Sequence, residues 1–527
     1  MNLAEIALRR GREPANANHP AFLTAEGPVS NAEFQRMVFA LVADLRAAGV
    51  TPGGRVIVRM TNSVEFAAAV LACIWIGAIP VLQNSQFGRS ELEHIVNLSD
   101  PLLFLLSDAM RDDAATAGLR PTTPRLIVTR EALIAPPSAR PRESGDPAQE
   151  GLDSRLRGNE RMPLPIDASR DAEAFVVFTS GTTGKPKGVV HAHRWLEALG
   201  DSNRARVPPQ QGDVILATGE WSFISALGHN VMFPLRNGTT GSIMEDRAAP
   251  ERILETIQRD RVTLLHSVAT LYRRILGTPG IETRFDVSSL RGCNSTGEPL
   301  EDSVRREWQA RFGCPIWEHY GVSEAQMVIG DGPTVEKREG STGRTWGARA
   351  AVVDANLKPL PAGETGTLAF GLDYPGFFLG YLGDEDATSK AMRGGFFVTS
   401  DLARMDDDGY VFIVGRADDC FKSKGVLIAP RELEDAILGL GRFEEACVFA
   451  IPDREIGNRI GAALVPRAGA EAIDEAALAK ALTGKIAPFK LPHRVLTFDA
   501  LPKNANGKTQ RSQVARLALE RAAAAGG

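Results

Sequence analysis

The chain has 527 residues, of which 43% are hydrophobic and 24% charged, an ordinary globular composition that is long enough for two or more domains. Its formal net charge of −5 argues against a general nucleic-acid binder and against attachment to an anionic membrane by charge. The five cysteines form no CxxC pair and fit neither a zinc site nor a disulfide framework, so we expect a reducing cytoplasm. The N-terminus lacks the apolar run of a secretory signal, and no apolar stretch reaches the roughly 20 residues of a membrane span, so we expect no integral membrane association.

The first part of the chain alternates helix and strand. Apolar residues repeat at helical spacing over 31–48, where Gly49 can end the helix, and residues 64–76 also read as a helix. Short apolar runs predict four strands, at 55–60, 79–82, 102–106 and 125–129. This alternation predicts a mainly parallel sheet covered by helices on both faces.

Residues 136–165 interrupt the alternation. They are rich in Pro, Arg, Gly and Asp and lack apolar periodicity, so they cannot bury enough surface to offset their ordering entropy. We interpret them as a disordered surface insertion, and they resemble peptides translated from dispersed bacterial repeat elements. The alternative is a basic docking loop.

The second part of the chain ends in a domain of a different kind. The α/β pattern resumes at Ala174, and residues 366–414 are rich in strands, with a hairpin turn signal at Asp407–Gly409. After it, helices are expected at 431–440, at 474–482 and at the C-terminal end, and strands at 446–451, 462–466 and 494–498. The prediction is an α/β fold with a large N-terminal domain of mainly parallel sheets covered by helices, residues 1–415, a hinge at 416–418, and a small mobile α+β domain, residues 419–527.

The strongest chemical signal lies at residues 175–188, which read FVVFTSGTTGKPKG. A buried strand leads into a loop of hydroxyl residues, glycines and two lysines. Glycines let backbone N–H groups approach an anion closely, and hydroxyls and lysines add donors and positive charge, so the loop predicts a phosphate cradle. It is not the P-loop of kinases and GTPases, because Pro186 follows Lys185 where that loop has Ser or Thr. The alternative is a flexible polar turn.

This loop resembles the signature of the adenylate-forming superfamily, which includes acyl- and aryl-CoA synthetases, adenylation domains of peptide synthetases and beetle luciferases. Further motifs of that family follow in its order: NSTGEP at 294–299, YGVSE at 320–324, TSD at 399–401, GRADD at 415–419, KSKGVLIAPRELE at 422–434 and LPKNANGK at 501–508. The resemblance therefore covers nearly all of residues 20–512 outside the insertion.

The resemblance implies ATP-binding roles for the motifs of the large domain. Tyr320 would stack on adenine, Ser323 would donate to the α-phosphate, and Glu324 would hold Mg²⁺. Asp401 would bind both ribose hydroxyls, since a carboxylate accepts two hydrogen bonds. The whole ATP set implied is Thr179, Ser180, Gly181, Thr182, Thr183, Gly184, Lys185, Lys187, Thr296, Gly297, Glu298, Pro299, Tyr320, Asp401 and Arg416.

The small domain would supply the catalytic lysine and the thiol tunnel. Lys508 would bridge the substrate carboxylate and the α-phosphate, with Ser323 and Glu324 as the other catalytic residues; Lys503 lacks the preceding glycine and is the weaker candidate. Asp418 would be the hinge, and Gly425 would line the pantetheine tunnel. Many relatives carry Arg where this chain has Leu427, so no phosphate role is transferred there.

The implied reaction joins a carboxylic acid to coenzyme A at the expense of ATP, through an acyl-adenylate and with Mg²⁺. The acid is expected to be aromatic, with a tentative pocket of Trp221, Phe223, His229 and Val268; plain core is the alternative for the two aromatic residues. The sequence also allows a separate acyl-carrier protein as the acceptor, a medium-chain or fatty acid as the substrate, or a non-catalytic nucleotide or acyl-CoA binder. We expect no nucleic-acid partner, and a monomer and a homodimer both remain open. His191 and His193 share one face of a strand, but no third metal ligand is evident beside them.

Overall fold

The computed structural model describes residues 1–113, 115–135, 164–179, 185–245, 248–467, 469–470, 473–503 and 509–525. Residues 136–163 of the expected insertion lie outside this part. Within the described ranges, no helix combines the length and the apolar character needed to cross a membrane.

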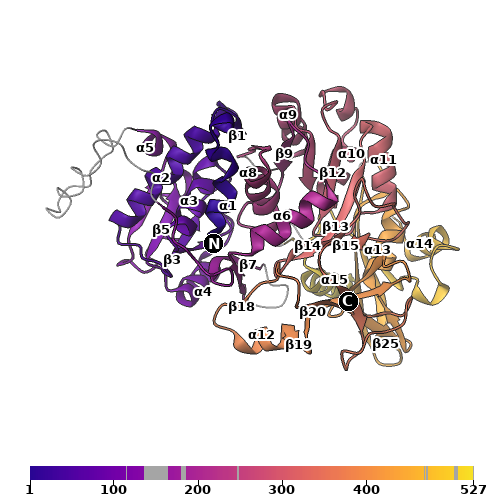
Figure 1. Ribbon diagram of the computed structural model, residues 1–527. Helices are drawn as coiled ribbons and strands as arrows, with labels where there is room; N and C mark the ends of the chain where they lie inside the picture. Colours follow the sequence, from indigo (N-terminus) through magenta and orange to yellow (C-terminus); the bar gives the residue numbers. More distant parts are fainter. Residues whose placement is uncertain are drawn as a thin grey trace, which may run out of the picture.

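A seven-stranded sheet forms the first layer of the large domain, in the order β18-β8-β7-β4-β3-β5-β6. The strands from β7 to β6 in this order pair in parallel, and β8 pairs antiparallel with both of its neighbours. Their bounds are β3 Arg55–Arg59, β4 Ile79–Leu82, β5 Leu103–Ser107, β6 Arg125–Val128, β7 Glu173–Phe178, β8 Gly188–Ala192 and β18 Gly380–Tyr381. The helices beside it are α1 Leu3–Leu8, α2 Asn31–Ala47, α3 Val64–Trp75, α4 Arg89–Ser99 and α5 Arg130–Ile134 (Figure 1).

Local chemistry explains why the N-terminal helices start and stop where expected. The hydroxyl of Ser63 accepts a hydrogen bond from the backbone of Phe66 and caps α3, and Ser30 caps α2 in the same way. All but one of the residues of α3 are buried, because the helix lies between α2 and the sheet. The helices and strands expected over 31–129 are confirmed within two residues at each end.

A nine-stranded sheet is the largest of the large domain, with the order β15-β14-β13-β12-β11-β9-β10-β1-β2. Its strands are β1 Pro20–Thr24, β2 Gly27–Ser30, β9 Val214–Ala217, β10 Thr240–Ser242, β11 Leu264–Ser267, β12 Gly292–Thr296, β13 Ile316–Val322, β14 Gln326–Gly330 and β15 Arg344–Thr345. The helices that follow or separate them are α6 Trp195–Arg206, α7 Ile224–Leu227, the π-turn η6 Gly228–Met232, α8 Phe233–Asn237, α9 Pro250–Asp260, α10 Ala269–Gly277 and α11 Asp302–Phe312. Apolar residues of β9, β11, β12 and β13 pack with α9, α10 and α11 into one core on one face.

A five-stranded antiparallel sheet completes the large domain. It consists of β16 Ala350–Val353, β17 Gly366–Gly371, β19 Met392–Arg393, β20 Phe396–Met405 and β21 Val411–Arg416, with the short helix α12 Glu385–Ala391 beside it. The expected turn at 407–409 is confirmed: it joins β20 to β21, and Gly409 takes the positive φ of 79° that such turns favour in glycine.

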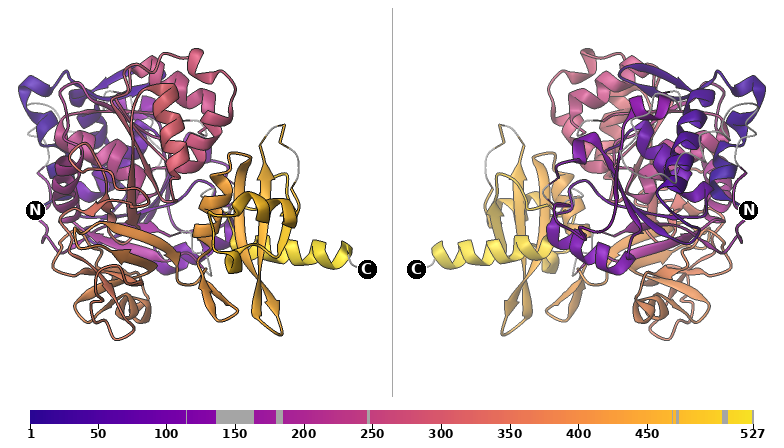
Figure 2. Two further views of the ribbon diagram at one scale, coloured as in Figure 1. Left: turned by 90° about the vertical axis from the view of Figure 1, so that its right-hand side faces the viewer. Right: turned by 90° about the vertical axis from the view of Figure 1, so that its left-hand side faces the viewer.

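The small domain has two hydrophobic clusters of its own around a three-stranded sheet. Figure 2 shows it to one side of the large domain, with α15 ending away from it. Its elements are β22 Phe421–Ser423, β23 Val426–Ile428, α13 Pro430–Leu438, β24 Phe443–Asp453, β25 Gly457–Pro466, α14 Glu475–Leu482, β26 Arg494–Thr497 and α15 Arg511–Ala525. The α/β class with a large and a small domain is confirmed; β24 and β25 are longer than expected, and the β22–β23 hairpin was not anticipated.

Candidate active site

The predicted nucleotide residues meet although they come from three sheets. Thr179 follows β7, Thr296 ends β12, Tyr320 lies near the end of β13, and Asp401 lies in β20. The carboxyl ends of strands are where open α/β sheets bind ligands.

Two hydrogen bonds and one cation–π contact show this convergence directly. The Lys187 ammonium lies 5.0 Å from the centroid of the Tyr381 ring, and the Tyr381 hydroxyl donates to Oε1 of Glu324 at 2.5 Å. The Tyr320 hydroxyl donates to Oδ2 of Asp401 at 2.6 Å. The signature loop, the YGVSE motif and the TSD motif therefore border one site.

The Glu324 carboxylate suits a hard cation. Its pKa lies above the ordinary value because burial outweighs the hydrogen bond from Tyr381. Among the described residues, no group of three or more His, Cys, Asp and Glu side chains is arranged to hold a metal ion by itself. Magnesium that is bound mainly through phosphates needs only one or two carboxylates, so the residues present fit that cation.

Asp401 and Arg416 stand opposite each other in the β20–β21 ladder. The Arg416 guanidinium donates to the Ser400 hydroxyl at 2.8 Å and lies 4.0 Å from the carboxylate of Asp418. Asp418 is exposed in the turn that leads from β21 towards the small domain. The expected ribose carboxylate, Asp401, therefore pairs with the first residue of the expected hinge, Arg416.

The turn after β12 is held from the side by α10. Gly297 is exposed and has a φ of 84°, while Glu298 accepts a hydrogen bond of 2.9 Å from the Thr270 hydroxyl and lies 3.8 Å from Arg273. Pro299 follows at the start of the loop to α11. The turn expected at the adenine is therefore fixed by contacts of its glutamate.

The signature loop is closed at its base. The backbone N–H of Thr179 donates to the carbonyl of Lys187 at 3.0 Å, and the N–H of Lys187 reaches the Thr179 hydroxyl at 3.3 Å. Lys185 and Lys187 are both exposed, so their charges are available to an anion. Ser180, Gly181, Thr182, Thr183 and Gly184 lie outside the described residues.

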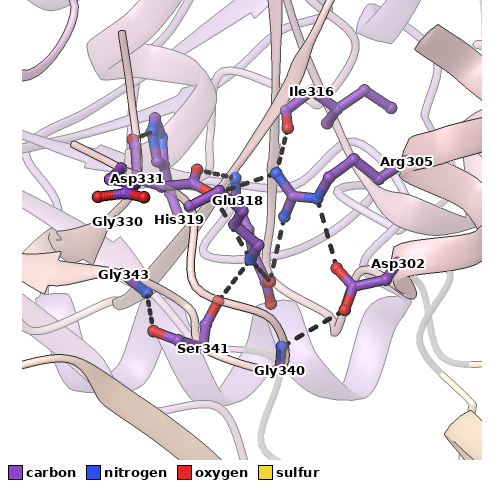
Figure 3. A network of polar contacts seen from close by, with 12 residues as sticks. Asp302, Arg305, Ile316, Glu318, His319, Gly330, Asp331, Gly340, Ser341 and Gly343 are labelled. Atoms are coloured by element: carbon purple, nitrogen blue, oxygen red, sulfur yellow. Dashed lines mark hydrogen bonds and ion pairs between the residues drawn. The ribbon is translucent and has the colours of Figure 1, made fainter. Parts of the chain in front are cut away.

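Strand β13 is anchored by a buried ion-pair network (Figure 3). The Arg305 guanidinium lies 3.6 Å from Glu318 and 3.1 Å from Asp331, and the Asp331 carboxylate accepts the Glu318 backbone N–H at 2.6 Å. Arg431 of the small domain adds a contact of 3.6 Å to Glu318. Because Glu318 precedes Tyr320 by two residues, the network fixes the strand that carries the YGVSE motif.

The small domain was expected to supply Lys508 and Gly425. Lys508 lies outside the described residues. Gly425 forms the turn of the β22–β23 hairpin with a φ of 78°, and the next two residues, Val426 and Leu427, are 39% and 44% exposed. The hairpin faces solvent in this structure.

The four residues expected in the acyl pocket have different surroundings. Trp221 is buried, and its ring packs 6.1 Å from Phe22 and 6.0 Å from Phe66 in the main core. Phe223 and Val268 are half-buried where α7 and α10 begin. His229 is buried in η6, away from the Trp221 contacts.

The two histidines after the signature loop make structural hydrogen bonds. His191 stacks on Phe175, and its Nε2 lies 2.9 Å from the carbonyl of Ser323. Burial lowers the pKa of His191 to about 3, so the ring is neutral and can donate to that carbonyl from one nitrogen. His193 accepts the backbone N–H of Leu3 on Nδ1. His191 therefore helps to position Ser323.

Tyr381 is the site residue that motif reasoning missed. It belongs to the two-residue strand β18, which is too short to show a period in the sequence. Its signal is chemical: an aromatic hydroxyl that follows a glycine after a run of aromatic residues. In the fold it links Lys187 to Glu324.

Comparisons with known proteins agree with this fold. The model of the AMP-binding enzyme family matches residues 11–382, and the model of the AMP-binding enzyme C-terminal domain matches residues 432–508. A 3-hydroxybenzoate/4-hydroxybenzoate–CoA ligase of Thauera aromatica is 28% identical over 97% of this chain and 96% of its own. ATP-bound MatB from Rhodopseudomonas palustris superposes with a TM-score of 0.83 at 26% identity, covering 98% of this chain and 99% of that one. The anthranilate CoA ligase AuaEII in complex with anthranoyl-AMP shares the fold, with a TM-score of 0.87 at 24% identity over 99% and 98% of the two chains.

A large α/β domain with the predicted nucleotide residues at its strand ends, followed by a small α+β domain, is the architecture of a two-domain adenylating enzyme. The chain belongs to the AMP-binding enzyme family.

Proposed function

We propose that this protein is an AMP-forming acyl-CoA ligase whose substrate is an aromatic carboxylic acid. The observation that carries the proposal is the joining of Lys187, Tyr381 and Glu324 on one side and of Tyr320 and Asp401 on the other. The activities named for the Thauera aromatica relative and for the anthranilate ligase support an aromatic acid and coenzyme A.

In the first half-reaction the substrate carboxylate attacks the α-phosphorus of ATP, and the bond to the pyrophosphate leaving group breaks. Lys185 and Lys187 bind the phosphates, Tyr320 stacks on adenine, and Asp401 binds the ribose hydroxyls. Lys508 reduces the repulsion between the two anions where they meet, so its contribution is largest in the transition state. Mg²⁺, which Glu324 would hold, supplies charge neutralisation on the phosphates.

In the second half-reaction a thiol attacks the acyl carbon of the adenylate and AMP leaves. We propose that the small domain rotates about Asp418, removes Lys508 and brings Gly425 to the site. The end of β21 at Arg416 and the start of β22 at Phe421 support domains of residues 1–415 and 419–527 with a hinge at 416–418.

The test is pyrophosphate release from ATP across a panel of aromatic, medium-chain and small aliphatic acids. We expect release that depends on Mg²⁺ and on an aromatic acid, followed by thioester formation when coenzyme A is added. If the thioester forms only with a phosphopantetheinylated carrier protein, the acceptor is that carrier protein and not coenzyme A. Absence of acid-dependent release with every acid would refute the proposed function.

A further inference from the structure

A polar layer lies under the nine-stranded sheet, on the face opposite α9 to α11. We define it as Arg206, His229, His266, Asn294 and Gln326. His266 and Asn294 are register partners on the parallel strands β11 and β12, so their side chains share that face. Arg206 ends α6, His229 lies in η6, and Gln326 begins β14.

Gln326 connects the layer to the strand that carries the YGVSE motif. Gln326 pairs with Val322, between Tyr320 and Glu324, and its φ of 71° is uncommon for a residue with a side chain. Its amide Nε2 lies 3.4 Å from Nδ1 of His229. Backbone outliers of this kind gather at ligand sites.

Two stacked imidazoles form the middle of the layer. The His229 and His266 rings lie 3.9 Å apart with an interplanar angle of 5°. The half-buried Ser225 joins them: its carbonyl lies 3.0 Å from Nδ1 of His229 and its hydroxyl 2.9 Å from Nε2 of His266. Burial lowers the pKa of His229 to about 3, and burial also lowers the pKa of His266, so both rings are neutral.

Arg206 is the one formal charge among the five residues of this layer, and no ion pair to it occurs among the described residues. Its side chain is almost fully buried, and its Nε and Nη1 find no hydrogen-bond partner in the same part of the chain. The nearby carboxylate of Asp331 is already paired with Arg305 and Lys337. A buried charge without a partner is costly, so the guanidinium requires an acceptor.

Other polar atoms of the layer are also unsatisfied, and a small pocket reaches two of its residues, His229 and Asn294. Nδ1 of His266, Oδ1 of Asn294 and Oε1 of Gln326 are buried without a hydrogen-bond partner in the described part of the chain. Buried polar groups are nearly always hydrogen-bonded, so such a group of exceptions points to a missing ligand. A small pocket lined by Asn203, His229 and Asn294 adjoins the layer.

We propose that the polar layer is the distal end of the acyl site, and that the substrate acid carries a second, hydrogen-bond-accepting group there, a ring hydroxyl or carboxylate bound by Arg206. The inference rests on the proposed function, since it names the acid that the same site takes. The guanidinium donates to the ring substituent, and the neutral imidazoles form a polarisable wall beside the ring.

The test compares pyrophosphate release with benzoate, hydroxybenzoates and benzenedicarboxylates, in the wild type and in Arg206→Met and Arg206→Lys. We expect the wild type to prefer a substituted acid over benzoate by at least about tenfold in kcat/KM, as one hydrogen bond to a charged group provides. Arg206→Met should lose that preference through a lower kcat/KM for the substituted acid, and Arg206→Lys should retain part of it. Arg204→Met, an exposed arginine on the same helix, is the matched control and should leave the preference as it is.

The wild-type preference is informative even if a variant fails to fold, which thermal melting detects. An equal kcat/KM for benzoate and every substituted acid in the wild type overturns the inference. An equal loss of kcat/KM for all acids in a folded Arg206→Met variant overturns it as well. Absence of release with all aromatic acids refutes the proposed function instead.

Discussion

The two domains present their functional residues in opposite ways. In the large domain the proposed nucleotide residues are already joined by hydrogen bonds, Tyr320 to Asp401 and Glu324 to Tyr381, and Glu318 anchors the strand that carries Tyr320. In the small domain Gly425 lies on an exposed hairpin that faces solvent. We therefore propose that the large domain is preorganised for the first half-reaction and that the small domain moves between the two half-reactions.

The contact between the domains fits this division. Arg431 approaches Glu318 at 3.6 Å, and Glu318 also has Arg305 and Lys337 as partners inside the large domain. Loss of the Arg431 contact therefore leaves Glu318 paired. This contact can therefore break without leaving the Glu318 carboxylate as an uncompensated buried charge.

The largest expected effect concerns Lys508. Lys508→Ala should lower adenylation, measured as acid-dependent pyrophosphate release, by roughly 10²–10³-fold, because an ammonium at the point of greatest negative charge is lost. Thioester formation from supplied acyl-AMP should be largely kept. Lys503→Ala is the control, since Lys503 pairs with Glu445 at 3.0 Å within the small domain. Equal loss of both half-reactions in Lys508→Ala would contradict the division between the domains.

Gly425 should show the reverse pattern. Gly425→Leu should leave pyrophosphate release unchanged and slow thioester formation by about 10-fold or more, because a leucine side chain would obstruct the path of the thiol. Reaction rates fall steeply when the reactants are displaced from their productive positions. Gly484→Leu is matched to Gly425→Leu, with the same φ of 78°, the same exposure and the same domain. If both variants slow thioester formation alike, backbone strain and not obstruction is the cause.

The smallest expected effect concerns the hydrogen bond between Tyr381 and Glu324 in the large domain. Tyr381→Phe removes a hydrogen bond that lowers the pKa of Glu324, so that pKa should rise further. Only the carboxylate form suits Mg²⁺, and its fraction falls as the pH drops through the pKa. The acid limb of kcat/KM for ATP should therefore move to higher pH by about one unit, the size of one charged hydrogen bond. If the acid limb of the pH profile does not move, the ionisation of Glu324 does not determine that limb.

The sequence predicted the regular parts of the fold because their patterns are local. The helix over 31–48 and the buried strand at 175–178 need only periodicity and neighbouring turn residues. The short helix α12 and the hairpin of β22 and β23 were missed, since α12 spans only about two turns and each strand of the hairpin has three residues.

The site divides in the same way. Motif residues such as Glu324 and Asp401 were proposed because each belongs to a recognisable motif. The polar layer was not, because Arg206, His266 and Gln326 are far apart in the chain and only the sheet brings them together. Composition could not show whether Trp221 faces a ligand or the core, and the structure puts its ring beside Phe22 and Phe66.

The pairing of Asp401 with Arg416 has a consequence for turnover. A ribose bound by Asp401 would lie beside Arg416, two residues before the proposed hinge at Asp418. The release of AMP and the rotation of the small domain back to its first position would then be coupled. Accumulated AMP should therefore slow this return rotation as well as compete with ATP.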